Sequence, residues 1–99
     1  MRRVRLADEA KADLREIGRF SRAAWGVERT RIYLAALNGK MWGLLENPLR
    51  GSRREDIDDL RSVRSGRHVV FYEVTQDGVR VLRILHDQMD HPIHLNPRP

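Results

Sequence analysis

Two helical stripes dominate the first half of the chain. In each, small and apolar residues recur alternately three and four positions apart, which places them on one face of an α-helix. Gly26 separates the stripes, and Asn47-Pro48 ends the second, as expected at helix ends. The pattern predicts an antiparallel helical hairpin, preceded by a short strand at Val4 and Leu6. The two stripes are Ala7, Ala10, Leu14, Ile17, Ser21 and Ala24, and then Val27, Thr30, Leu34, Leu37, Met41 and Leu44.

The last third of the chain has the composition of strands. Segments 67–74 and 79–86 are rich in β-branched residues and flank Gln76-Asp77-Gly78. Asp-Gly is a strong hairpin signal because tight hairpin turns demand positive φ. A strand over 60–64, turned by Ser65-Gly66, precedes this hairpin. Residues 68–74 are apolar on both faces apart from Glu73, so we expect that strand to be central and covered.

Residues 48–59 are predicted to be a connecting loop, because they combine Pro48, Gly51 and an acidic run with only two apolar residues. The element order is then strand, helix, helix and a three-stranded meander. This order predicts an α+β fold in which an antiparallel sheet of about four strands is packed by the N-terminal helical hairpin. At 99 residues we expect a single domain covering 1–99, with one modest core.

Composition narrows the class of protein. The chain has no cysteine, which excludes a disulfide framework and thiolate metal sites. Neither an apolar signal segment nor a transmembrane run is visible, so we expect a soluble, cytoplasmic protein. The formal net charge is +5, and every basic residue except Lys11 and Lys40 is arginine. This favours a polyanion or an acidic protein segment as partner, although a coding bias towards arginine gives the same composition.

Several segments, taken in order, resemble the ParE toxins of bacterial toxin–antitoxin pairs. The terminal hairpin reads HVVFYEV and then VRVLRILHDQMD, and the first helix carries AKADLREI followed by Trp25-Gly26. Asn47-Pro48, Gly51 and Leu60-Arg61 match further along, so the resemblance spans nearly the whole chain. One departure is the acidic run 55–59, where relatives usually place a glycine just before the Leu-Arg pair.

This resemblance implies a RelE/ParE-like fold and a type II toxin that poisons DNA gyrase, with no catalytic residue and no cofactor. It also implies a ParD-like antitoxin, whose C-terminal segment wraps the toxin and whose N-terminal half binds operator DNA. The wider superfamily contains RelE-like toxins, which cut messenger RNA on the ribosome, and that activity is the alternative. A basic nucleic-acid-binding module is a third interpretation, but no recognition helix or stacking pattern favours it.

A ribonuclease of the RelE kind would need an acid, a base and cations around a phosphate. The residues that could serve are Arg61, Arg64, Arg83 and His86, with Tyr72 also available but more simply explained as a core residue. Each has a plainer interpretation, because strand arginines are usually solvated and a histidine at a strand end more often makes a structural hydrogen bond. Met89 also stands where RelE-like relatives often have a tyrosine. The leading hypothesis therefore assigns no catalytic residue.

The outer face of the second helix lacks the charged residues that a solvated face normally carries. Ile32, Ala36, Gly39 and Gly43 lie opposite the buried stripe, with Trp42 on the flank. A glycine inside a helix costs about 1 kcal/mol relative to alanine, which suggests that something packs close to this backbone. We expect an antitoxin segment along this face, with Trp42 as an anchor. A harmless small-residue face is the alternative.

The C-terminal segment 86–95 carries apolar residues that a short tail cannot bury by itself. They either fold back onto the sheet or contribute to the target-binding surface. The resemblance makes the tail a candidate toxicity element, and the candidate target-binding residues are Arg83, His86, Met89, Asp90 and His94. Histidines and carboxylates cluster here, but their spacing lacks a recognised metal-binding pattern, so no metal is predicted.

Overall fold

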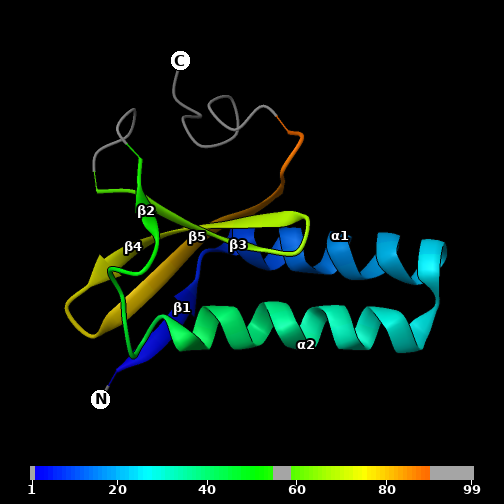
Figure 1. Ribbon diagram of the computed structural model, residues 1–99, viewed down its shortest axis with the longest axis horizontal. Coiled ribbons are helices and arrows are strands. Elements are labelled where there is room, and N and C mark those ends of the chain that lie inside the picture. The colour runs from blue at the N-terminus through cyan, green and yellow to red at the C-terminus, as the bar shows by residue number, and fades with distance from the viewer. Residues whose placement is uncertain (1, 55–58, 90–99) are drawn as a thin grey trace.

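The computed structural model describes residues 2–54 and 59–89, and in this part of the chain five strands form one sheet beside two long helices (Figure 1). The strand order is β1-β5-β4-β3-β2. α1 packs on β5, and α2 packs on α1 and β3. The elements are β1 (Arg3–Leu6), α1 (Asp8–Trp25), α2 (Val27–Gly43), β2 (Ser52–Arg53), β3 (Arg61–Ser65), β4 (His68–Thr75) and β5 (Gly78–His86).

The predicted α+β fold with an N-terminal helical hairpin is confirmed, but the sheet is mixed. β1 runs parallel to β5, with Arg3 opposite Gly78 and Leu6 opposite Val81. β2 lies within the segment predicted to be a loop and pairs with the start of β3. β2 was missed because two residues are too few to show an alternating pattern. The parallel pairing of β1 was missed because the pattern of one strand does not specify which strand lies beside it.

Gly26 separates the two helices as predicted. Its φ of 89° lies in the region that L side chains rarely adopt, so the chain turns sharply here. The Gly26 N–H donates to the carbonyl of Arg22, and the Thr30 hydroxyl donates to the Gly26 carbonyl at 2.7 Å. The first bond satisfies a carbonyl in the last turn of α1, and the second is made by a side chain in the first turn of α2. α1 thus ends at Trp25 and α2 begins at Val27.

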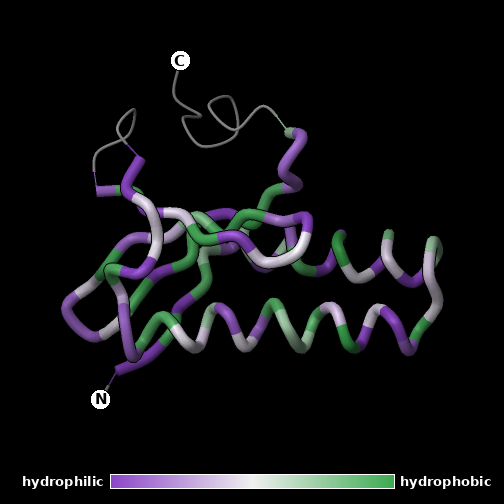
Figure 2. Tube along the Cα trace, viewed as in Figure 1, coloured by the Kyte–Doolittle hydropathy of each residue, from purple (hydrophilic) through white to green (hydrophobic). Residues whose placement is uncertain are grey.

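β4 is central and buried on both faces, as the apolar run predicted. Val70 and Tyr72 face the core shared with the helices, whereas Phe71 packs with Leu60 and Leu85 in a second cluster. Hydrophobic residues follow the strands at the centre of the molecule in Figure 2.

At the hairpin tip the predicted stripes are exposed: Ala24 and Val27 lie on the surface, because the tip projects beyond the sheet (Figure 1).

The buried Tyr72 fixes the turn that follows α2. Its hydroxyl donates to the Pro48 carbonyl at 2.6 Å and accepts from the Gly51 N–H at 2.9 Å. A Cβ on Gly51 would lie 2.6 Å from the Ser62 carbonyl oxygen, so only glycine fits. This contact joins the end of the hairpin to β3 and β4.

Within the described ranges, neither helix is long and apolar enough to span a membrane.

Candidate functional site

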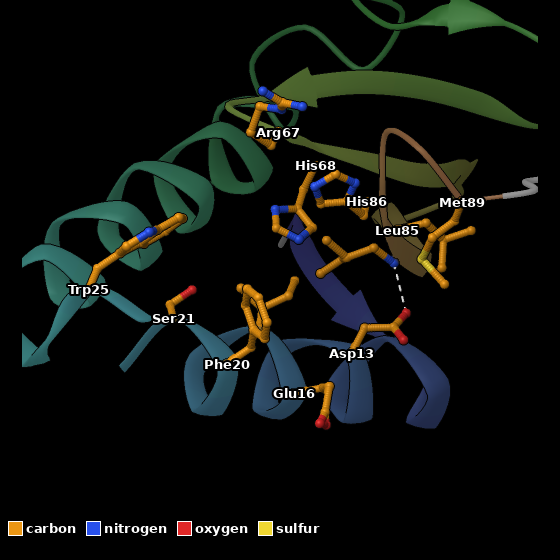
Figure 3. A pocket seen from close by; sticks show the side chains of 12 residues that line it. Asp13, Glu16, Phe20, Ser21, Trp25, Arg67, His68, Leu85, His86 and Met89 are labelled. Carbon is orange, nitrogen blue, oxygen red and sulfur yellow. Dashed lines mark hydrogen bonds between the residues drawn. The ribbon is translucent and has the colours of Figure 1, made fainter. Parts of the chain in front are cut away.

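An open, largely apolar groove of about 500 Å³ lies between α1 and the adjoining ends of β4 and β5 (Figure 3). We call it the α1 groove. Phe20 and Trp25 on its α1 side are 69% and 42% exposed, and Met89 opposite them is 39% exposed. His68 and His86 contribute the imidazole rings on the strand side. Large apolar side chains left in water around a cavity are typical of a binding surface.

Asp13 of α1 anchors the strand side of this groove. Its carboxylate accepts two bonds from the Arg83 guanidinium, at 2.8 and 3.0 Å, and a third from the Ile84 N–H at 2.9 Å. β1 pairs with residues 78–81 of β5, so among the described residues no strand lies beside the edge of β5 beyond Val81. Asp13 therefore accepts the hydrogen bond from the Ile84 N–H that a neighbouring strand would otherwise accept. The hydrogen bond to Asp13 raises the pKa of Arg83, and the pair ties α1 to β5.

Tyr33 of α2 connects the helical hairpin to the histidines. Its hydroxyl lies 2.6 Å from Nδ1 of His68, accepts from the Arg67 N–H at 3.0 Å and lies 3.3 Å from the Ser65 carbonyl oxygen. The His68 ring stacks edge-on against His86, with ring centres 5.4 Å apart. Burial, and then the neighbouring His86, lower the pKa of His68.

Asp87 follows β5 and binds two arginines. Its Oδ2 lies 3.1 Å from Nη1 of Arg64 and 3.4 Å from Nε of Arg67. Its Oδ1 is buried, has no hydrogen-bond partner among the described residues, and lies 3.1 Å from Nδ1 of His86. Burial opposes ionisation of this carboxyl, but the hydrogen bond from Arg64 and the charges of Arg67 and His86 outweigh it and lower the pKa of Asp87.

The four residues that a ribonuclease would use do not converge on one point. Arg64 and His86 meet at Asp87, whereas Arg83 is held by Asp13. Arg61 donates to the carbonyls of Gly51 and Leu49, in the turn after α2. All four side chains have protein partners, and these contacts position strands and turns rather than a substrate.

The outer face of α2 is open to solvent. Ile32 and Trp42 are 58% and 50% exposed, and Ala36 and Gly39 are exposed beside them. A Cβ on Gly39 would have no heavy atom within 4 Å, and one on Gly43 would meet only the tip of Arg50 at 3.7 Å. In the described part of the chain, therefore, no packing contact explains the two glycines.

Of the candidate target-binding residues, His86 and Met89 lie together at the α1 groove, and Arg83 is beside it in the bond to Asp13. Asp90 and His94 lie outside the described residues, as do most of the residues weighed for a metal site.

Sequence reasoning missed the groove itself, and with it Phe20, Trp25 and His68. The sequence did contain a signal for this surface, because the aromatic residues Phe20 and Trp25 lie outside the predicted buried stripe of the first helix.

The family model described as the ParE toxin of the type II toxin–antitoxin system, parDE, matches residues 4–91. This chain belongs to the ParE toxin family. The ParE1 toxin of Caulobacter vibrioides is 40% identical over 98 residues, which cover 96% of this chain and 99% of the relative. The ParE-family chain is thus a toxin of a type II toxin–antitoxin system, as its resemblance indicated.

Two solved toxin–antitoxin structures share the fold of this ParE-family chain. The chromosomal ParDE system of P. aeruginosa superposes with a TM-score of 0.74 at 18% identity, covering 87% of this chain and 96% of that one. The RelBE2 toxin–antitoxin complex of Mycobacterium tuberculosis gives a TM-score of 0.58 at 28% identity, covering 84% and 94%. The RelE/ParE-like fold is therefore confirmed.

Proposed function

We propose that this ParE-family toxin poisons DNA gyrase by holding its cleaved-DNA complex, and that a ParD-like antitoxin neutralises it. The observation that carries the proposal is the large area of apolar side chain left in water on the helical hairpin. Phe20, Val27, Ile32 and Trp42 are each at least half exposed in a chain of only 99 residues. Such a surface favours a protein partner over a small substrate.

The antitoxin contact is proposed along the outer face of α2. The open space above Gly39 and Gly43 allows a partner helix to approach the backbone closely, with Ile32, Ala36 and Trp42 beside it. Operator DNA is then bound through the antitoxin. Both the toxin and gyrase would act in the cytoplasm.

The target-binding element is proposed at the end of β5 and the residues after it. His86 and Met89 lie at the mouth of the α1 groove, and Asp90 and His94 follow in the chain. Arg83 would contribute by holding β5 against α1 through Asp13, which fixes the direction in which the chain leaves the sheet. This role requires no bond to be made or broken by the toxin.

The similarity to the RelBE2 complex makes ribosome-dependent RNA cleavage the second candidate. It would rest on Arg64 and His86, which share Asp87, together with Arg61 and Arg83. The bonds that hold Arg61 and Arg83 to the protein count against it, because a phosphate would have to replace them.

A pair of assays separates the two candidates. Purified toxin is added to gyrase in supercoiling and DNA-cleavage assays, with and without the antitoxin, and to ribosomes translating a defined transcript. We expect double-strand breaks that the antitoxin suppresses, with intact RNA. Cleaved transcript with unaffected gyrase, lost in His86→Asn, would replace the gyrase proposal with the ribonuclease.

A further inference from the structure

One end of the α1 groove carries an excess of positive charge. Arg64 and Arg67 share the single carboxylate of Asp87, and the rings of His68 and His86 lie beside them. The carboxylates on the α1 side are already neutralised. Asp13 binds Arg83, and Glu16 pairs with Arg19 on the same helix. The groove therefore combines an apolar wall with a cationic end.

His68 can accept a proton if only the Tyr33 hydroxyl rotates. The Tyr33 hydroxyl accepts from the Arg67 N–H, so its own proton is available for Nδ1 of neutral His68 at 2.6 Å. When Nδ1 is protonated, that ring donates to Tyr33 instead, and the hydroxyl turns to the Ser65 carbonyl oxygen at 3.3 Å. A tyrosine with two possible acceptors thus supports both charge states of the ring.

His86 has an equally ready partner for its charged form. Asp87 Oδ1 is buried without a hydrogen bond in the described part of the protein, at 3.1 Å from Nδ1 of His86. In the neutral ring this nitrogen accepts from the Gln88 N–H at 3.1 Å. A protonated ring would donate to Asp87 and satisfy an oxygen that is otherwise desolvated at a cost, while the exposed Gln88 N–H would turn to water.

Two effects oppose full protonation in the free toxin. His68 is partly buried, and a second positive ring would lie next to it. In the described ranges, the other charged or titratable groups around His68 are Tyr33 from α2, Asp13 and Glu16 from α1, and Arg64, Arg67 and Asp87. An anion placed at this end of the groove would offset both effects, since it pairs with the charged rings.

We infer that the α1 groove binds an antitoxin segment bearing an acidic side chain next to an apolar one, and that binding takes up a proton on the His68–His86 pair. The apolar side chain packs beside Phe20, with Trp25 and Met89 at the two ends of the groove, and the carboxylate lies at Arg67 and the two imidazoles (Figure 3). This inference rests on the proposed antitoxin, which would contact the α1 groove in addition to the outer face of α2 and so cover the proposed target-binding residues His86 and Met89. It adds the chemistry of the antitoxin side chains that enter the groove, of which we call the acidic one the acidic anchor, and a dependence of the affinity on pH.

The test measures the affinity of the toxin for the ParD-like antitoxin encoded beside it, between about pH 8 and about pH 6, by titration calorimetry. Linkage to one proton raises the affinity by at most about tenfold for each pH unit lowered. Titrations in phosphate and in Tris, which differ in ionisation enthalpy, report the proton uptake directly. We expect His68→Asn to flatten the pH profile and to lose most of the uptake.

A second variant avoids dependence on His68→Asn folding well. Arg67→Gln removes an exposed guanidinium at the cationic end and should weaken binding about threefold at pH 6. Arg80→Gln is the matched control, because Arg80 is similarly exposed, lies in β5 away from the groove and pairs with Glu73. It should leave the affinity unchanged.

The outcomes separate this inference from the function on which it rests. Binding with a flat pH profile, or affinity that falls as the pH is lowered, would overturn the acidic anchor and leave the antitoxin in place. Affinity that falls would indicate an apolar group against the histidines. No binding at any pH would overturn the antitoxin assignment and the inference with it.

Discussion

α1 and α2 have nearly the same length and form one hairpin, yet they relate to the sheet in opposite ways. α1 buries a single stripe against β5, and Asp13 on it hydrogen-bonds both a side chain and the backbone of that strand. α2 buries Thr30, Leu37 and Met41, but its opposite face is also apolar or small. α1 therefore organises the groove, whereas α2 leaves an uncovered face.

This difference separates two kinds of surface that a small toxin can offer to a partner. The α1 groove is shaped by a polar bond between distant segments, so its geometry depends on the fold. The outer face of α2 depends only on the spacing of apolar and small residues along one helix. Substitution of Asp13 in α1 should therefore affect stability first, and substitutions on the outer face of α2 should affect binding first.

The largest expected effect is the loss of Asp13. Asp13→Ala removes the carboxylate that accepts from the Arg83 guanidinium and the Ile84 N–H, in a site where the side chains of Asp13 and Arg83 are mostly buried. We expect the free energy of unfolding to fall by about 3 kcal/mol in urea denaturation. Asp8→Ala, at an exposed position in the first turn of α1, is the control and should cost less than about 1 kcal/mol. Equal losses would contradict the anchoring role.

Removing the Tyr33 hydroxyl tests the polar contacts that join α2 to the turn between β3 and β4. Tyr33→Phe leaves the Arg67 N–H and Nδ1 of His68 without this partner, and we expect a loss of about 1–2 kcal/mol. The measurement is the same urea denaturation. A variant as stable as wild type would show that α2 is held by apolar packing alone.

Filling the outer face of α2 should separate binding from stability. Gly39→Gln places a side chain where there is open space, so the thermal midpoint should stay close to wild type or rise slightly. Affinity for the antitoxin should fall at least tenfold, or about 1.4 kcal/mol. Ala12→Gln, at an exposed position of α1, is the matched control. Unchanged antitoxin affinity in Gly39→Gln would leave this face without a role.

The smallest effect is the pH dependence of stability that His68 contributes. Its pKa is lowered in the folded protein by burial and by His86, so the unfolded chain binds more protons over a window that opens near pH 6.5 and extends below it. Stability should therefore fall as the pH is lowered through that window. We expect the thermal midpoint of wild type to fall relative to that of His68→Asn as the pH is lowered from about 8 to about 5. Parallel curves would rule out His68 as the source.

Much of the fold could be predicted because it depends on local periodicity. The two stripes, Gly26 and the Asp-Gly turn each involve interactions over a few residues, and these elements formed where expected, except that α2 ends at Gly43, before the predicted stop at Asn47-Pro48. The outer face of α2 was also visible in sequence, because a helix with a period of 3.6 fixes which residues share a side. The groove was not, because Asp13 and Arg83 are 70 positions apart.

The sequence alone determined the helical hairpin, the central apolar strand and the resemblance to the ParE toxins. Each follows from residue order, since spacing sets the faces of helices and strands. Tertiary structure alone decided the parallel pairing of β1 with β5, the short β2 and the gathering of Tyr33, His68, His86 and Asp87. These contacts join distant segments, and a sequence pattern specifies which face a strand buries but not the neighbour it will meet.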